Sequence, residues 1–388
     1  MTPQHRPGGP HGGSLRPQGL KIGLSTTTTE PALTGGHIDG IGVYSQALLR
    51  ELPQQGVAVA PWSFGPARQL TVGRPMRHPF PLAMLRDLVL PGVRERMDVD
   101  LFHATDYRIV RMDRPIVATL HDALPIAHPE WCSPKLRQLK NRLQIQAARK
   151  ADHVIAVSHY AIAELVRCFG VDERRISVVP NGVDEAWLDT PDPREVAATL
   201  SQHGLRAGYF LTVGTLQPRK NIERLLQAYL GLPASVRSQR QLAIVGAPGW
   251  RCDGLLAQIH AAQQNGENVV WLSKVTGAEA LRHVYAGAGV FVFPSLYEGF
   301  GIPVVEAFGS GVPVIASTAT SVPEVTAGAA FDVDPLSVPA IGTAMLDLAR
   351  DEALRRRFTD AGKVRAVELT WRETARKTVA VYESVLKN

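Results

Sequence analysis

The feature that most constrains the fold is residues 290–325, which read VFVFPSLYEGFGIPVVEAFGSGVPVIASTATSVPEV. The short apolar run at 290–293 is typical of a buried parallel strand. Pro303 fits the first turn of a helix over residues 302–309, where its missing N–H costs nothing. Residues 312–316 form the next apolar run. The order strand, glycine loop, helix, strand predicts a doubly wound α/β sheet.

Two carboxylates lie in this stretch, Glu298 in the loop and Glu306 in the predicted helix. Ligands of doubly wound sheets lie in the crevice outside the carboxyl ends of the strands. A helix N-terminus there offers free N–H groups to an anion. One carboxylate could accept hydrogen bonds from a sugar hydroxyl and the other from a ribose diol. Taken alone, however, two acids eight residues apart also fit a pair of exposed surface carboxylates.

Length and composition limit the class of protein. A chain of 388 residues is too long for one ordinary core, so we expect two domains. A hydrophobic content of 45% with 20% charged residues is typical of a globular protein. Aromatic residues make up only 6%, which argues against a stacking surface for nucleic acid. The net charge of +6 fits phosphate-bearing substrates or an acidic membrane surface.

The compartment is predicted from cysteine usage and targeting signals. The three cysteines are far apart and form no CxxC pair, which fits a reducing cytoplasm. Neither a signal peptide nor an apolar run of about 18 residues is evident. Residues 1–19 are rich in Pro and Gly and predict a disordered tail.

The first half of the chain alternates strands with helices. We expect strands at 20–25, 57–64, 100–105, 116–120 and 153–158, and a helix at 43–52. The loop before that helix contains Gly40 and Gly42, and such a loop allows close backbone approach to a phosphate. It is not a G-x-G-x-x-G fingerprint, and a glycine-rich turn without a ligand remains an alternative.

His121 follows the predicted strand at 116–120 directly, with Asp122 beside it. A histidine at the carboxyl end of a parallel strand faces the ligand crevice. Asp122 could orient its ring. A capping or loop histidine is the simpler alternative.

Residues 131–150 contain no acid and several bases interleaved with leucines at helical spacing. A basic amphipathic helix of this kind can lie on anionic lipid, although the solvated face of an ordinary helix fits as well. The basic residues are Lys135, Arg137, Lys140, Arg142, Arg149 and Lys150.

The second half opens with an apolar strand over residues 209–214, which ends at Gly214 and is followed by a helix at 222–230. Arg219 and Lys220 lie in the turn between them. Adjacent cations at such a turn can neutralise a diphosphate, the arginine by bidentate bonds and the lysine as a point charge. Alone, the two would also fit an exposed surface pair.

The motifs together resemble the retaining glycosyltransferases of family 4, which have the GT-B fold. Glu298 and Glu306 match the E-x7-E signature of that family, and Arg219 and Lys220 match its diphosphate-binding pair. The V-P-N-G-V-D run at 179–184 resembles the end of the family's first domain. The resemblance implies two Rossmann-like domains facing across a cleft: residues 20–190 bind the acceptor and 205–368 the nucleotide sugar. It also implies a final helix, 369–388, that crosses back to the first domain.

The resemblance further implies a retaining hexosyl transfer from a nucleotide-diphosphate sugar to a saccharide or lipid-linked acceptor. The chain looks most similar to bacterial mannosyltransferases of O-antigen and exopolysaccharide assembly, which makes GDP-mannose the leading donor. By the same resemblance the catalytic residues are His121, Glu298, Arg219 and Lys220. Donor-binding positions are Gly40, Gly42, Gly214, Arg219, Lys220, Lys274, Val275, Glu298, Gly299, Phe300, Gly301, Ile302 and Glu306.

No metal or cofactor is expected. The D-x-D triplets at 98–100 and 332–334 lie beside a predicted strand and before a predicted helix, where such short matches are common. Two alternatives remain: a nucleotide-sugar epimerase of the same fold, and a non-catalytic nucleotide-sugar-binding protein. We expect a cytoplasmic location, with peripheral contact to the inner face of the membrane through residues 131–150.

Overall fold

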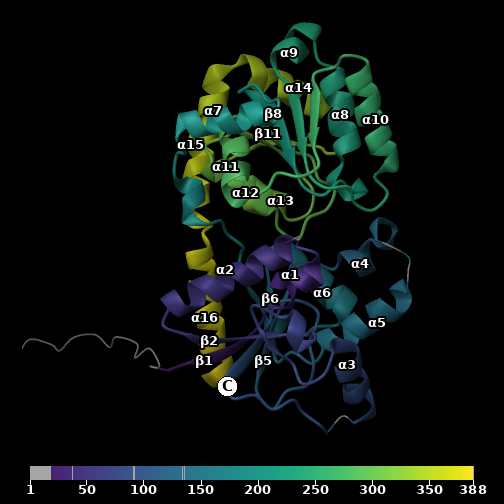
Figure 1. The fold of residues 1–388 in the computed structure, drawn as a ribbon, viewed down its shortest axis with the longest axis vertical. Coiled ribbons are helices and arrows are strands. Elements are labelled where there is room, and N and C mark those ends of the chain that lie inside the picture. The colour runs from purple at the N-terminus through teal and green to yellow at the C-terminus, as the bar shows by residue number, and fades with distance from the viewer. Residues whose placement is uncertain (1–18, 37, 91, 133, 135, 388) are drawn as a thin grey trace, which may run out of the picture.

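The computed structural model describes residues 19–36, 38–90, 92–132, 134 and 136–387. The predicted disordered tail, except for Gly19, lies outside the described residues, as does Lys135. The chain forms two domains, each built on a parallel sheet with helices on its faces (Figure 1). The predicted GT-B architecture of two doubly wound domains is therefore confirmed.

The N-terminal domain contains a seven-stranded sheet with strand order β3-β2-β1-β4-β5-β6-β7. All neighbouring strands are parallel. The order reverses at β1, so the chain winds outward in both directions from the centre of the sheet. Its strands are β1 (Lys21–Ser25), β2 (Ala58–Ser63), β3 (Arg74–Pro75), β4 (Leu101–Ala104), β5 (Ile116–Leu120), β6 (His153–Ala156) and β7 (Ile176–Val178).

Two helices of this domain, α2 and α6, begin at a side chain that caps them. Asp39 caps α2 by accepting a hydrogen bond from the Gly42 N–H at 2.9 Å. Ser158 caps α6 in the same way, and Gly170 ends that helix in the left-handed conformation. The helices are α1 (Pro31–Thr34), α2 (Gly40–Gln54), α3 (Phe80–Val89), α4 (Leu124–Ala127), α5 (Arg137–Ala148) and α6 (His159–Phe169).

The C-terminal domain contains a six-stranded parallel sheet with strand order β10-β9-β8-β11-β12-β13. Its strands are β8 (Tyr209–Val213), β9 (Leu242–Val245), β10 (Val269–Leu272), β11 (Ala288–Phe293), β12 (Val314–Ser317) and β13 (Phe331–Val333). Its helices are α7 (Pro193–Gln202), α8 (Ile222–Leu230), α9 (Ala234–Gln239), α10 (Asp253–Gln264), α11 (Ala278–Ala286), α12 (Ile302–Gly309), α13 (Val322–Thr326), α14 (Val338–Arg350) and α15 (Glu352–Glu368).

The last helix, α16 (Trp371–Lys387), leaves the C-terminal domain and packs on α2 of the N-terminal domain (Figure 1). Tyr382 anchors it, because its buried hydroxyl bonds to the Nδ1 of His103 on β4 at 2.6 Å. Trp371 lies edge-on to Tyr44 of α2. The chain thus crosses between the domains at residues 183–192 and again before α16.

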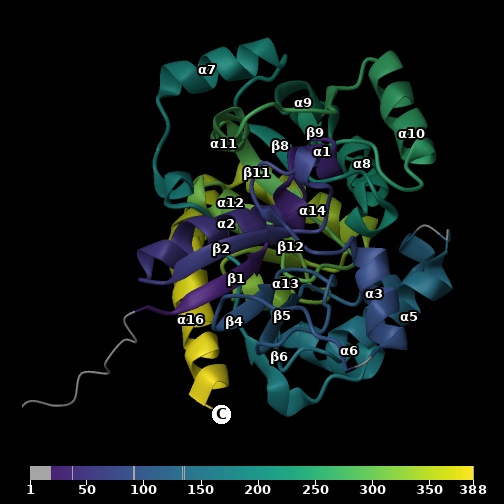
Figure 2. The same cartoon turned by 60° about the horizontal axis from the view of Figure 1, so that its bottom comes forward.

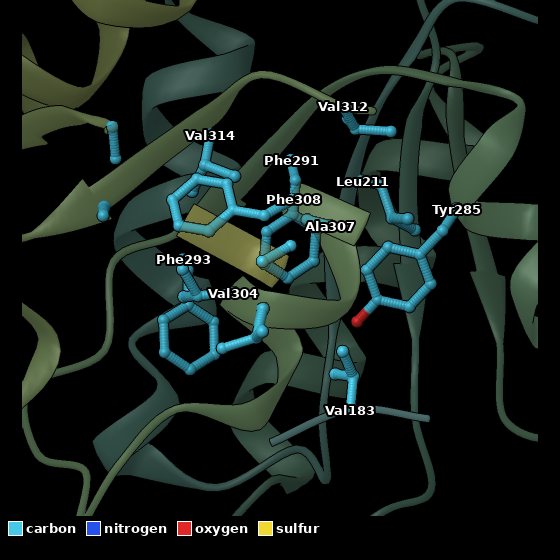
Figure 3. Close-up of a cluster of buried hydrophobic side chains, with 14 of the residues drawn as sticks. Val183, Leu211, Tyr285, Phe291, Phe293, Val304, Ala307, Phe308, Val312 and Val314 are labelled. Carbon is cyan, nitrogen blue, oxygen red and sulfur yellow. The ribbon is translucent and has the colours of Figure 1, made fainter. Parts of the chain in front are cut away.

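The core of the C-terminal domain includes residues of the segment that connects the two domains. Phe291 and Phe293 of β11 stack with ring centroids 5.9 Å apart. Phe308 of α12 and Tyr285 of α11 pack around them in the same cluster, together with Val183 from the crossing segment (Figure 3). The helix and strand that carry the predicted site are therefore held by a close-packed core.

Several predicted elements differ in detail. The predicted helix over 131–150 is shorter, because Leu136 takes a positive φ and α5 begins only at Arg137. The triplet at 332–334 lies before a helix as predicted, but Ser337 caps α14, and Asp334 accepts a hydrogen bond from the Leu336 N–H. Within the described residues, no helix combines the length and the apolarity needed to cross a bilayer.

Candidate active site

Glu298 is the centre of a charged cluster in the C-terminal domain. It is only 7% exposed, and each of its carboxylate oxygens has its own cation. Arg219 donates a hydrogen bond to Oε2 at 2.8 Å, and Lys220 donates one to Oε1 at 2.6 Å. Burial by itself raises the pKa of Glu298, but the charges of Arg219 and Lys220 outweigh burial and bring the pKa down to about 2. The carboxylate is therefore ionised at neutral pH.

The loop that carries the two cations is tied to the end of β11. Asn221 is buried in the left-handed conformation at φ 59°, and its side-chain amide donates to the carbonyls of Pro294 at 2.9 Å and Pro335 at 2.6 Å. Gly214, at φ 149°, leaves room for the lysine, because a Cβ there would lie 3.3 Å from the Lys220 Cε. The predicted Gly214 therefore lies directly against the Lys220 side chain.

The loop after β11 is fixed from the other side. The Glu298 N–H donates to Thr320 Oγ1 at 3.1 Å, and the Ser321 hydroxyl donates to the carbonyls of Glu298 and Phe300. Gly301 then turns the chain at φ 112° into α12. The free N–H groups at this helix start and the cations of the neighbouring loop form one positive region.

Glu306 lies in the second turn of α12 and is partly buried. Tyr285 donates a hydrogen bond to its Oε2 at 2.9 Å. Burial raises the pKa of Glu306 to about 7, while the Tyr285 hydrogen bond works against this and the nearby charge of Asp184 adds to it. The Lys220 charge also acts on Glu306, so the lysine lies near both predicted carboxylates.

His121 is buried at the end of β5 in the opposite domain. Its Nε2 lies 3.0 Å from the carbonyl of Thr105 and must carry the proton, because a carbonyl only accepts. Its ring packs edge-on against Tyr44 with centroids 4.9 Å apart. Burial lowers the pKa of His121, so the ring is neutral at pH 7.

The prediction that Asp122 orients His121 is wrong. The carbonyl of Thr105 holds the ring, whereas Asp122 Oδ1 accepts a hydrogen bond from the Leu124 N–H at 3.0 Å and so starts α4. Burial raises the pKa of Asp122. This contact could not be predicted from the sequence, because Thr105 follows β4 whereas His121 follows β5.

The two domains touch at the predicted site residues. A Cβ on Gly299 would lie 2.2 Å from the His121 carbonyl oxygen. The Ser158 hydroxyl donates to the Gly299 carbonyl at 2.8 Å, and the His159 N–H donates to the Glu324 carboxylate. A separate pocket of about 210 Å³ is lined by Trp131 of the N-terminal domain and, in the C-terminal domain, by residues 217–218, 221–224, 251–252, 255 and 296. The structure thus brings His121 to the Glu298 loop.

Tyr297 makes a second, buried contact between the two domains. Its ring is wholly buried, and its hydroxyl donates to the Glu164 carboxylate of α6 and accepts from the Ala123 N–H at 3.2 Å. The ring of His128 lies edge-on to it at 5.0 Å. The hydroxyl therefore fixes the segment that follows His121 relative to the loop that carries Glu298.

Replacing Tyr297 by phenylalanine should lower kcat more than donor affinity, because the two domains lose their shared buried hydroxyl. We expect unfolding to become easier by about 1–3 kcal/mol. Steady-state kinetics and thermal melts measure both effects. The matched control is Tyr229→Phe, which removes a buried hydroxyl bonded to carbonyls within the C-terminal domain. A fall in stability with unchanged kcat in both variants would contradict a role for Tyr297 in positioning.

The other predicted donor-binding residues lie at helix starts and strand ends. Gly42 is closely packed, because a Cβ there would lie 2.8 Å from the Thr28 carbonyl oxygen. Around Gly40, by contrast, a Cβ would meet no atom within 4 Å. Ile302 starts α12 and packs against the cores of both domains. Lys274 is exposed and Val275 half-buried in the loop after β10.

The two D-x-D triplets do not converge on the site. Asp98 and Asp100 bond to Lys21 at the start of β1, the end of the sheet opposite the carboxyl edge. Asp334 caps the turn at Leu336. Neither triplet joins Glu298 or Glu306.

Six residues of the site were not predicted: Tyr285, Tyr297 as the domain contact, Asn221, Thr320, Ser321 and Thr105. Each acts through a partner at least 20 residues away or through a backbone group. Asn221 alone had a local signal, since it directly follows the two cations at a strand-to-helix turn.

Two facing parallel-sheet domains with this charged cluster at their carboxyl edges define a GT-B glycosyltransferase. Comparison with known families agrees: the model of "Glycosyl transferases group 1" matches residues 201–365, and that of "Glycosyltransferase Family 4" matches residues 38–187. The chain belongs to glycosyltransferase family 4.

Curated relatives cover most of the chain. The O-antigen chain mannosyltransferase B of Escherichia coli is 32% identical over 73% of this chain and 74% of its own length. The MMP alpha-(1->4)-mannosyltransferase of Mycolicibacterium hassiacum is 30% identical over 81% of this chain and 77% of its own length. The relatives support glycosyl transfer as the activity of this chain.

Solved structures share the fold at lower identity. Sucrose-phosphate synthase from Thermosynechococcus elongatus aligns with a TM-score of 0.70 and 22% identity, covering 95% of this chain and 99% of its own. Anabaena Alr3699/HepE in complex with UDP and glucose aligns with a TM-score of 0.71 and 19% identity, covering 94% and 100%.

Proposed function

We propose that this chain transfers a hexose from a nucleotide-diphosphate sugar to an acceptor hydroxyl with retention of configuration. The observation that carries the proposal is the double ion pair of Glu298 with Arg219 and Lys220 at the start of α12. Two cations and a helix start can bind a diphosphate, and the carboxylate between them can accept bonds from sugar hydroxyls.

In this reaction Arg219 and Lys220 must stabilise the diphosphate leaving group. The bond between the anomeric carbon and the diphosphate oxygen breaks, and its electron pair stays on the diphosphate. Arg219 and Lys220 offset that charge, which is the kind of fixed electrostatic stabilisation that dominates many enzymes. The acceptor oxygen bonds to the anomeric carbon from the same face, and its proton passes to the departing diphosphate oxygen.

His121 has a binding role in this scheme. Its neutral ring is held by Thr105, and its backbone carbonyl lies against Gly299 of the donor loop. We place it beside the donor sugar near the C6 hydroxyl. We also propose that no metal takes part, because two fixed cations already offset the diphosphate charge.

Mannose from GDP-mannose is the proposed donor, since the relatives named above are mannosyltransferases. The proposed acceptor is a saccharide or lipid-linked saccharide of a cell-surface polysaccharide. Peripheral contact with the membrane through residues 131–150 belongs to the same proposal. Within that stretch Lys140 and Arg142 are exposed, whereas Arg137 and Lys150 bond inside the protein.

The test is a donor panel in the presence of EDTA: GDP-mannose, UDP-glucose, UDP-galactose and UDP-N-acetylglucosamine. Binding is followed by saturation-transfer NMR, and slow hydrolysis by nucleotide release. One donor bound and cleaved, with the released sugar first appearing in the donor's anomeric form, supports the proposal. Epimerised donor would favour an epimerase, and binding without cleavage or transfer would favour a non-catalytic binding protein.

Donor affinity should rise with pH through 7. Glu306 has a pKa of about 7 in the free protein, and a carboxylate that accepts both ribose hydroxyls must first lose its proton. Binding of GDP-mannose should therefore tighten about tenfold between pH 6 and pH 8 and release a proton over that range. A nucleotide sugar is the right probe, because its diphosphate diester does not titrate there.

Calorimetry in buffers of different ionisation enthalpy measures both the affinity and the proton release. Glu306→Gln should weaken binding and flatten the pH profile, whereas Glu352→Gln, at an exposed position on α15, should leave it intact. A slope that persists in Glu306→Gln would place the titrating group elsewhere.

A further inference from the structure

The helices α7 and α11 pack against each other in the C-terminal domain and bring polar side chains together. They lie side by side in two views 60° apart (Figures 1 and 2). Each helix contributes two polar residues four positions apart: Glu195 and Thr199 on α7, and Glu279 and His283 on α11. Residues four apart share one face of a helix, so the two pairs meet where the helices touch.

His283 is the fixed member of this group. It is only 6% exposed, and its Nδ1 lies 2.8 Å from the Thr199 hydroxyl oxygen. Its Nε2 makes no hydrogen bond to any residue that the structure describes, because Glu195 Oε2, at 4.0 Å, is too far away. Buried polar atoms normally have a partner, so this nitrogen needs a further one.

Two carboxylates converge on the same point. One oxygen each from Glu195 and Glu279 and a ring nitrogen of His283 all lie within 4.8 Å of one another. Both glutamates are exposed and lie in the first turn of a helix, where the positive end of the helix favours an acid. That preference explains each glutamate alone. It does not explain why two like charges gather at an imidazole nitrogen that lacks a hydrogen bond.

We propose that Glu195, Glu279 and His283 bind a divalent transition-metal ion, with zinc as the leading occupant. Imidazole nitrogen and carboxylate oxygen are both zinc ligands, and three protein ligands leave one position for water. Magnesium and calcium take oxygen ligands, so the histidine argues against them. Thr199 completes the site, because a hydroxyl that accepts from the Nδ1–H leaves the lone pair of Nε2 for the ion.

The geometry requires movement of exposed side chains only. Tetrahedral zinc with ligands at about 2.1 Å places the ligand atoms about 3.4 Å apart. The three atoms here lie within 4.8 Å, so they must approach one another by up to about 1.4 Å. His283 can stay where Thr199 holds it, because the two exposed glutamates can change rotamer at little cost.

The bound ion would strengthen the connection between the two domains. α7 directly follows the crossing at residues 183–192, and α11 also carries Tyr285, which bonds to Glu306. Arg282 of α11 donates to the carbonyl of Asp189 in the crossing at 3.4 Å, so the two segments already touch there. An ion shared by α7 and α11 adds a link at the same place. It supports the fold and takes no part in the proposed transfer.

The experiment is a zinc titration of the tag-free full chain after removal of metal with EDTA. Calorimetry and competition with a chromophoric chelator should give one equivalent per chain. Zinc at 100-fold excess over its Kd should raise Tm by roughly 3 °C or more. Cobalt should bind at the same place without the intense charge-transfer band that a thiolate ligand gives. No donor or acceptor is present, so failure here leaves the proposed transferase reaction standing.

Variants test the ligands and the residue that orients the histidine. Glu195→Gln with Glu279→Gln should weaken zinc binding by about 100-fold or more and abolish the rise in Tm. Thr199→Val keeps the shape of the side chain but removes the hydroxyl, so zinc binding should weaken about 10- to 100-fold, the usual cost of losing the outer partner of a ligand. Melts without metal check that each variant folds.

Two control variants exclude other sources of binding. Glu352→Gln with Glu173→Gln removes two exposed acids that also lie in the first turn of a helix. His5→Gln with His11→Gln removes the histidines that precede the first strand. Both double variants should bind zinc as the wild type does.

Three outcomes would overturn the proposal. The first is no zinc binding by the folded wild-type chain, which would leave an ordinary contact of His283 with Glu195. The second is an equal loss of binding in Glu195→Gln with Glu279→Gln and in the control that removes two other acids. The third is loss of binding only in His5→Gln with His11→Gln, which would assign the ion to the first residues of the chain.

Discussion

Replacing Arg219 by alanine should lower kcat for glycosyl transfer by about 10²- to 10³-fold, the usual cost of losing one donor to a developing negative charge. Arg219 contacts Glu298 and the Tyr297 carbonyl, and it lies beside Lys220 at the start of α8. Its guanidinium should move from the carboxylate to the diphosphate when the donor binds. The loss should therefore exceed the change in donor affinity, because the charge on the leaving oxygen grows during the reaction.

Two companion variants make this test specific. Arg219→Lys keeps the charge but loses the bidentate geometry, so it should recover only part of kcat. Arg356→Ala removes an exposed arginine of α15, and it should change kcat less than about twofold. Equal turnover in Arg219→Ala and Arg356→Ala would remove Arg219 from the catalytic cluster. Rates come from nucleotide release at saturating donor and acceptor.

The fold was predictable because its signals are local. Apolar runs as short as β8 or β10 alternate with helices whose ends carry Gly or Pro, and that alternation admits few architectures. The bounds of α8 and α12 agree with those predicted, since each begins after a turn residue and ends at a clear stop. α3 was missed because it is only ten residues long and no side chain caps its start.

The site was predictable only in part. Chemistry-bearing side chains could be placed at strand ends, because parallel strands put their carboxyl ends at one edge. The groups that hold those side chains could not be predicted. The carbonyl of Thr105, after β4, bonds to His121, and Tyr285 of α11 bonds to Glu306 of α12. A pKa of about 7 at Glu306 depends on that packing, and no spacing rule contains it.

Gly299→Ala should lower kcat by about 100-fold while leaving donor affinity within about threefold. Its backbone has no positive φ, so alanine is not strained there by itself. The new Cβ would instead lie 2.2 Å from the His121 carbonyl oxygen, and the domains would have to separate by about 1 Å. Displacement of that size between reacting groups is enough for such a loss, whereas donor contacts within the C-terminal domain remain.

Calorimetric titration of donor, steady-state kinetics and small-angle scattering of the donor-bound protein distinguish loss of closure from loss of binding. The variant should bind donor yet stay more extended than wild type. The matched control is Gly254→Ala in α10, where the nearest atom to a Cβ is 3.9 Å away. It should leave turnover intact and stabilise the helix by up to about 1 kcal/mol. Full turnover in Gly299→Ala would mean that the approach of Gly299 to His121 is no part of the catalytic cycle. A matching loss of donor binding would instead place Gly299 against the donor itself.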